Sequence, residues 1–145
     1  MTPPGGEHGH VAVNTAYLLK SYSKETGKGR VVVESGFYLE REPDTVRGPA
    51  VSFFLDKQLP IGYFEAAPDL AVEIVSPNDS SQELEEKVQG YLQSGVRLVL
   101  VLHPRTRSAY FYSQTGSVCR LTANDHFAPE LLPDFSCKVS EFFED

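Results

Sequence analysis

The stretch from Pro68 to Pro104 restricts the fold most, because it places an amphipathic segment between two apolar ones. Between Leu70 and Val75 the sequence is too apolar for a loop and too rich in β-branched residues for a helix, which predicts a strand. A second apolar strand is expected just before Pro104, and the segment between the two strands is typical of a helix. The stretch therefore predicts an α/β domain.

Glu73 is an acidic residue inside the first of these strands. Side chains alternate along a strand, so the opposite face is expected to carry Leu70, Val72 and Ile74. The face that carries Glu73 is expected to hold Asp69, Ala71 and Val75 as well. A carboxylate in such a strand is costly to bury unless a cation or hydrogen-bond donors meet it. Glu73 therefore predicts a partner nearby.

The helical segment follows turn-forming residues and ends at Gly95. Three residues can cap its start: Asp79, Ser80 and Ser81. Its apolar side chains recur at helical spacing on one face: Leu84, Val88, Tyr91 and Leu92. Lys87 falls on the side turned towards the sheet. Two interpretations stay open: Lys87 reaches the strand that holds Glu73, or its ammonium group extends to solvent along the helix flank.

Several segments of the chain occur in a characteristic order. They are PDTVRGPAVSFF at residues 43–54, then PDLAVEIVSPND, ELEEKVQGYLQSGV and LVLVLHP between residues 68 and 104, and LLPDFSCKVSEFF at residues 131–143. Together they resemble the Uma-two family of the PD-(D/E)XK nuclease-like superfamily, over nearly the whole chain. The resemblance implies a restriction-endonuclease-like fold, with a central mixed β-sheet flanked by helices and a C-terminal hairpin. It also implies a magnesium-dependent phosphodiesterase site that acts on DNA.

The chain departs from the family pattern at two site positions. The residue after Pro49 is normally an aspartate that forms the first metal-binding carboxylate, and here it is Ala50. In the superfamily a lysine commonly follows the glutamate by two residues, where this chain has Val75. The resemblance implies that the helix supplies the lysine instead, and Lys87 matches that position. Glu73 would then be the remaining metal ligand, with Glu73 and Lys87 as the catalytic pair.

Asp69 is not expected to replace the missing carboxylate. Asp69 and Glu73 are four residues apart on one strand, about 13 Å at roughly 3.3 Å per residue. Two carboxylates that share one magnesium ion must each bring an oxygen to about 2.1 Å from it. Asp69 is better interpreted as the residue that ends the loop and enters the strand. His103, where relatives often carry an acid, is expected to be structural.

The rest of the chain predicts further elements of one domain, residues 1–145. Residues 1–9 are rich in proline and glycine and are expected to be mobile. A helix is expected from His10 to about Glu25, and a short last helix over Val139–Phe143. Strands are expected over residues 30–40, 50–55, 108–112 and 118–121, the last two as a hairpin. Glu34 is expected at an exposed or edge position within the first of these strands.

Charge and cysteine content restrict the partners and the compartment. The net charge of −7 argues against general electrostatic affinity for nucleic acid, so DNA binding is expected to be weak. Arg105, Arg107 and Arg120 form a local basic group that is expected to be ordinary surface. Cys119 and Cys137 lack metal-ligand spacing and indicate a reducing compartment. Since no signal peptide or membrane-length apolar run occurs, the sequence predicts a soluble cytoplasmic protein.

Two functions remain open at this point. The first is a metal-dependent DNA endonuclease that is impaired because Ala50 replaces the first metal-binding aspartate, so that magnesium binding is weak. The second is a non-catalytic binding or interaction module in which Glu73 and Lys87 form a buried ion pair. Relatives usually carry a hairpin before the first helix, and this chain is expected either to have lost that strand pair or to have a misplaced start site. An uncovered sheet edge or apolar patch seeks a partner, so a homodimer is also expected.

Overall fold

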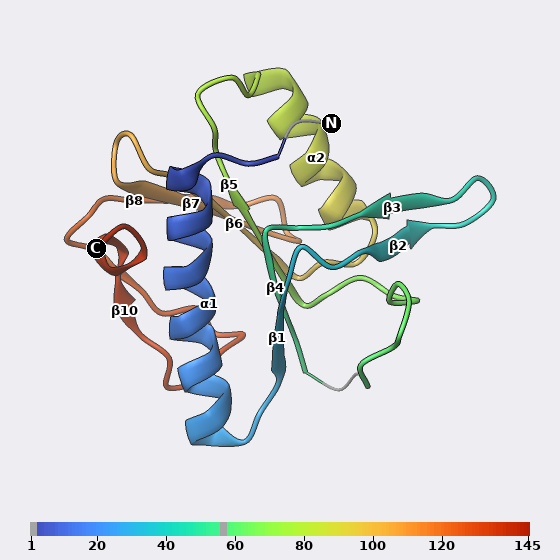
Figure 1. The fold of residues 1–145 in the computed structure, drawn as a ribbon, viewed down its shortest axis with the longest axis horizontal. Helices are drawn as coiled ribbons and strands as arrows, with labels where there is room; N and C mark the ends of the chain where they lie inside the picture. The colour runs from blue at the N-terminus through green and yellow to red at the C-terminus, as the bar shows by residue number, and fades with distance from the viewer. Residues whose placement is uncertain (1–2, 56–57) are drawn as a thin grey trace.

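The computed structural model describes residues 3–55 and 58–145, and a six-stranded mixed sheet forms its centre (Figure 1). The strands follow the spatial order β1-β4-β5-β6-β7-β8. Their bounds are Arg30–Val33, Val51–Phe54, Leu70–Ile74, Leu98–His103, Ser108–Ser113 and Val118–Leu121, respectively. β5 and β6 pair in parallel, and the other neighbouring pairs in this sheet are antiparallel.

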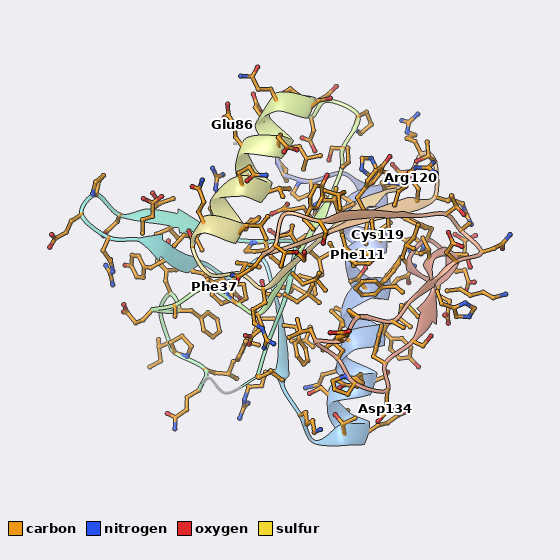
Figure 2. The ribbon with its side chains drawn as sticks, turned by 180° about the vertical axis from the view of Figure 1, so that it is seen from behind. Phe37, Glu86, Phe111, Cys119, Arg120 and Asp134 are labelled. Carbon is orange, nitrogen blue, oxygen red and sulfur yellow. The ribbon has the colours of Figure 1, made fainter. Side chains whose placement is uncertain are left out.

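Two helices cover opposite faces of this sheet. α1 (Gly6–Thr26) packs on the face that receives Leu70, Val72 and Ile74 of β5. α2 (Ser81–Gln93) connects β5 to β6 and packs on the other face, where Val88 and Tyr91 meet Ala71. This division follows the predicted alternation of side chains along β5. Glu86 lies on the outer side of α2 (Figure 2), so the helix keeps its acidic residues away from the core.

The last described segment of the chain completes the core on the α1 side of the sheet. The 3-10 helix η1 (Val139–Phe142) packs against α1, and both Phe142 and Phe143 are buried in the same core cluster. The Asn14 side chain donates hydrogen bonds to the carbonyl oxygens of Phe142 at 3.1 Å and Glu144 at 2.6 Å. Residues separated by about 130 positions therefore share one packed face.

Four short strands form two separate ribbons. β2 (Phe37–Glu40) and β3 (Thr45–Arg47) pair as a hairpin that projects from the sheet (Figure 1). Its base is anchored where the Phe37 and Phe64 rings stack with centroids 4.3 Å apart. β9 (His126–Phe127) pairs with β10 (Cys137–Lys138) beside η1.

The predicted fold class is confirmed: the domain is α/β, with a central mixed sheet, flanking helices and the β7–β8 hairpin. Ser80 is the residue that caps α2, since its hydroxyl accepts a hydrogen bond from the Glu83 N–H at 3.0 Å. α1 begins at Gly6 rather than His10, so residues 6–9 form its first turn, where Glu7 favourably meets the helix dipole. Met1 and Thr2, also expected to be mobile, lie outside the described residues.

The strand expected over residues 30–40 is broken into β1 and β2. Glu34 has a φ of +53°, a left-handed conformation that ends β1, and its N–H bonds to the Ala50 carbonyl oxygen at 3.2 Å. Glu34 is exposed beside the edge strand, as expected. In the part of the chain that the structure describes, no helix is long and apolar enough to cross a membrane.

Candidate functional site

Glu73 lies on β5 and points its side chain to the α2 face of the sheet. The carboxylate is almost buried, with 12% of the side chain exposed. Its position follows from the strand pattern, because the neighbouring Val72 and Ile74 point into the opposite core. The expectation that Glu73 needs a partner is confirmed by two contacts from α2.

Lys87 supplies the first contact. Its Nζ lies 3.8 Å from Glu73 Oε2, which is an ion pair without a direct hydrogen bond. The lysine reaches Glu73 because residues 84, 87 and 91 share the side of α2 that is turned to the sheet. The Lys87 side chain is also 36% exposed, so its ammonium group stays accessible from solvent while it faces Glu73.

Tyr91 supplies the second contact, which the sequence pattern treated only as part of the apolar face. Its hydroxyl donates a hydrogen bond of 2.5 Å to Glu73 Oε1. Burial raises the pKa of Tyr91 well above its usual value, and the Glu73 charge raises it further, so the tyrosine stays protonated and donates. The signal in the sequence was the spacing of four residues between Lys87 and Tyr91, which puts both over the same strand.

Burial has the largest effect on the pKa of the Glu73 carboxyl group. It raises the pKa of the Glu73 carboxyl above its ordinary value, although Lys87 and the Tyr91 hydrogen bond act to lower it. The electrostatic interaction with His8 acts to lower this pKa to a smaller extent, and Glu34 acts to raise it slightly. The carboxylate therefore holds a proton more readily than an exposed glutamate would.

Two polar cavities open beside this pair. One, of about 270 Å³, is lined by Glu73, Lys87, Arg47 and the first turn of α2. The other, of about 570 Å³, lies between Glu73, Lys87, His8 and the turn at residues 76–79. Arg47 and His8 come from β3 and α1, and the sequence interpretation did not place either of them at this site. Their approach depends on the β2–β3 hairpin and on the early start of α1, which sequence periodicity does not reveal.

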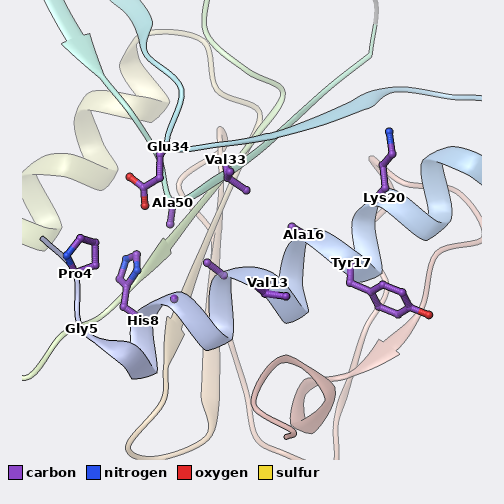
Figure 3. Close-up of a pocket in the computed structure, with 12 residues that line it drawn as sticks. Pro4, Gly5, His8, Val13, Ala16, Tyr17, Lys20, Val33, Glu34 and Ala50 are labelled. Atoms are coloured by element: carbon purple, nitrogen blue, oxygen red, sulfur yellow. The ribbon is translucent and has the colours of Figure 1, made fainter.

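Ala50 lies immediately before β4. Val51 pairs with Val72, so continuing the antiparallel register by one residue would set the Ala50 backbone opposite that of Glu73, while the Ala50 side chain belongs to the core cluster on the α1 side. The Ala50 methyl group is buried and lines an apolar cavity next to His8 and Glu34 (Figure 3). His8 lines both this cavity and a polar cavity of Glu73, so the two regions adjoin.

Two other residues considered for the site have structural contacts instead. Asp69 Oδ2 accepts a hydrogen bond from the Leu55 N–H at 2.8 Å, and Asp69 Oδ1 lies 3.9 Å from Arg97. Asp69 thus fastens the entry of β5 to the end of β4. The His103 ring packs edge-on against Tyr110 with centroids 5.1 Å apart, and burial lowers the pKa of His103.

The side chains present do not fit a divalent cation. Among the described residues, no three His, Cys, Asp or Glu side chains gather closely enough to hold a metal ion. Glu73 offers one carboxylate, and Tyr91 and Lys87 already engage its two oxygens. A hard cation such as Mg²⁺ requires more oxygen ligands than this arrangement provides at Ala50 and Glu73.

Comparisons with known proteins agree with this fold. The model of the Uma2 family, described as "Putative restriction endonuclease", matches residues 1–140. A crystal structure from Anabaena variabilis ATCC 29413, described as "a putative nuclease belonging to DUF820", superposes with a TM-score of 0.83. The two sequences are 18% identical, and the match covers 98% of this chain and 83% of that one. A search of curated proteins gives no match.

Proposed function

Since the chain belongs to the Uma2 family, we propose that it is a DNA endonuclease of the PD-(D/E)XK type whose phosphodiester-hydrolysing site is impaired. The observation that carries the proposal is the Glu73–Lys87 pair at two polar cavities, with Ala50 in the register position opposite Glu73. Glu73 and Lys87 would be the catalytic residues, with Glu73 as the one carboxylate that remains at the metal-binding position. Without a second carboxylate, binding of Mg²⁺ is weak.

The residues around the cavities favour an anionic ligand. Lys87 and Arg47 present cationic groups to the cavity that Glu73 lines, and His8 adds an imidazole to the adjoining one. Such groups contact phosphate oxygens and place a phosphodiester against the site. Lys87 would stabilise negative charge that develops on the phosphate, and Glu73 would accept or hold a proton, because burial raises its pKa.

The substitution Ala50→Asp tests the proposal. It should add the second carboxylate and give tighter Mn²⁺ binding in calorimetry together with a higher melting temperature when the ion is present. Without metal this variant should be less stable than the wild type, because two neighbouring carboxylates repel each other. Any plasmid nicking that appears should disappear again on Lys87→Ala or Glu73→Gln.

Ala50→Asn is the matched control, because it has the same shape as Ala50→Asp without the charge. It should gain little Mn²⁺ affinity. If Ala50→Asp gains no metal affinity while the wild type already cleaves DNA, the active site consists of other residues and the proposal is wrong.

The alternative is a binding module that keeps the fold without cleavage. Tyr91 favours it, since its hydrogen bond to Glu73 completes a closed polar network at the place where a metal would bind. Glu73→Ala separates the two functions. In a structural network the substitution removes the partner of Lys87 and Tyr91 and lowers the unfolding free energy. The loss is smaller than the roughly 3–5 kcal/mol of a fully buried pair, because Lys87 is partly exposed. A carboxylate kept for catalysis is costly to bury, so its removal would be neutral or stabilising.

A further inference from the structure

An apolar groove lies between α1 and the edge of the sheet, and at His8 it adjoins one of the Glu73 cavities. It forms a cavity of about 580 Å³ that is open along one side. Figure 3 shows Val13 and Tyr17 of α1 below it and Val33 of β1 above it. These side chains are 68%, 70% and 51% exposed, respectively. Exposed large apolar side chains that gather beside one another indicate an interaction surface rather than ordinary scattered exposure.

The groove runs along a free sheet edge. β1 is the outermost strand of the six-stranded sheet, so within residues 3–55 and 58–145 no strand pairs with its outer side. A free edge carries unpaired backbone N–H and C=O groups that favour pairing with another strand. The apolar groove and the open edge thus form one continuous surface, which we call the β1–α1 face, made of Val13, Tyr17, Lys20 and residues 30–34.

Charged residues of opposite sign lie at the two ends of the β1–α1 face. α1 and β1 run in opposite directions through the turn at residues 27–29, so Lys20 late in α1 lies towards the start of β1, where Arg30 is. Glu34 follows the other end of β1. Figure 3 shows Lys20 and Glu34 towards opposite ends of the groove. The face is therefore positive at one end, apolar in the middle and negative at the other end.

We propose that the β1–α1 face binds a second copy of the same chain across a two-fold axis, with β1 pairing antiparallel to β1 of the partner subunit. The axis passes near Val32, which sets Val31 opposite Val33 of the partner subunit. Glu34 of the partner subunit then meets Lys20 and Arg30. A two-fold interface must be complementary to itself, and a charge pattern that reverses along the strand meets this condition.

A small-molecule ligand suits the groove less well. Ligand sites enclose most of the ligand and orient it with a few placed polar groups. This groove is open along its side, and its lining is mostly apolar. The open strand edge would also remain unpaired beside a small ligand, whereas a second copy pairs both edges at once.

Light scattering and sedimentation at tens of micromolar test the interface. The wild type should have twice the chain mass of 16.1 kDa. Val33→Lys places a charge in the apolar middle of the face and should weaken the dimer at least about tenfold, since a two-fold axis applies each substitution twice. Tyr17→Arg on the helix side should act in the same direction, and circular dichroism checks that both variants stay folded.

The control is Val118→Lys on β8, the opposite edge of the same sheet, where the side chain is 54% exposed. It should leave the dimer unchanged. A charge exchange tests the orientation: Lys20→Glu and Glu34→Lys should each weaken the dimer, and the double variant should dimerise better than Glu34→Lys alone. A monomeric wild type, dissociation by Val118→Lys in place of Val33→Lys, or a double variant weaker than both single ones would overturn the proposal.

Discussion

The Glu73 carboxyl group is almost buried, and this burial should make the unfolding free energy depend on pH. A folded-state pKa above the ordinary value of 4.5 means that the folded chain binds the proton more tightly than the unfolded chain. The stabilising contribution of protonated Glu73 is then present below the unfolded pKa. It is lost as the pH rises from there through the raised folded pKa.

The substitution Glu73→Gln removes this titration and keeps an acceptor for Tyr91. Relative to the wild type, the variant should become more stable as the pH increases from about 4 to about 8. Urea unfolding at the two pH values measures the difference. Glu86→Gln, at an exposed position on the outer side of α2, is the control (Figure 2). Its unfolding free energy should differ from that of the wild type by the same amount at both pH values. A flat result for Glu73→Gln would mean that Lys87 and Tyr91 fully compensate the burial.

Tyr91 gives a second prediction at this scale. Tyr91→Phe removes the hydroxyl that donates to Glu73 Oε1 and leaves a buried carboxylate oxygen without that donor. The expected loss is about 1–3 kcal/mol of unfolding free energy at neutral pH, and less in acid, where Glu73 is protonated. Tyr17→Phe removes a hydroxyl from an exposed ring and should cost nothing measurable in the same denaturation experiment. Equal effects of the two substitutions would contradict the assigned role of Tyr91.

Single residues also mark the limit of what the sequence could predict about the site. Glu73 stood out because a charge interrupts an apolar strand, and Lys87 because a charge interrupts an apolar helix face. Arg47 and His8 carry no such mark, since each is an ordinary polar residue within its own segment. Only the tertiary arrangement of three separate elements brings them to the cavities of Glu73.

Among the elements, α2 determines the site because it carries both contacts to Glu73. Its start depends on the Ser80 hydroxyl, which accepts the Glu83 N–H at 3.0 Å. Ser80→Ala should therefore cost about 0.5–2 kcal/mol of unfolding free energy in a urea titration. Ser81→Ala removes the neighbouring hydroxyl inside the first turn and should change stability little. If the Ser81 variant loses as much as the Ser80 variant, the cap is assigned to the wrong residue.

Elements with a clear period were predictable, and short ones were not. β5, α2 and β6 show alternation or helical spacing over many residues, so their type and faces follow from the sequence. β9 and β10 contain two residues each, which is too short for any period. The break after β1 depends on a left-handed Glu34, a conformation that sequence patterns associate with glycine.

For the whole molecule, the net charge of −7 opposes contact with DNA. Cationic groups at the site are few, so binding to duplex DNA should be weak at low salt and fall steeply as salt is added. Filter binding of a labelled duplex at about 50 mM and about 200 mM salt measures this. Tight binding that persists at the higher salt concentration would indicate a cationic surface elsewhere on the molecule.

The packing of α1 against η1 has a consequence for synthesis of the protein. A ribosome adds about 5–20 residues each second, and early segments can fold before later ones exist. The α1 face of the sheet cannot close in this way, because Phe142 and Phe143 complete the core that α1 starts, and Asn14 bonds to the backbone at Phe142 and Glu144. Part of the packing surface of Val11 and Leu19 of α1 therefore stays uncovered until residues 142–143 have been synthesised.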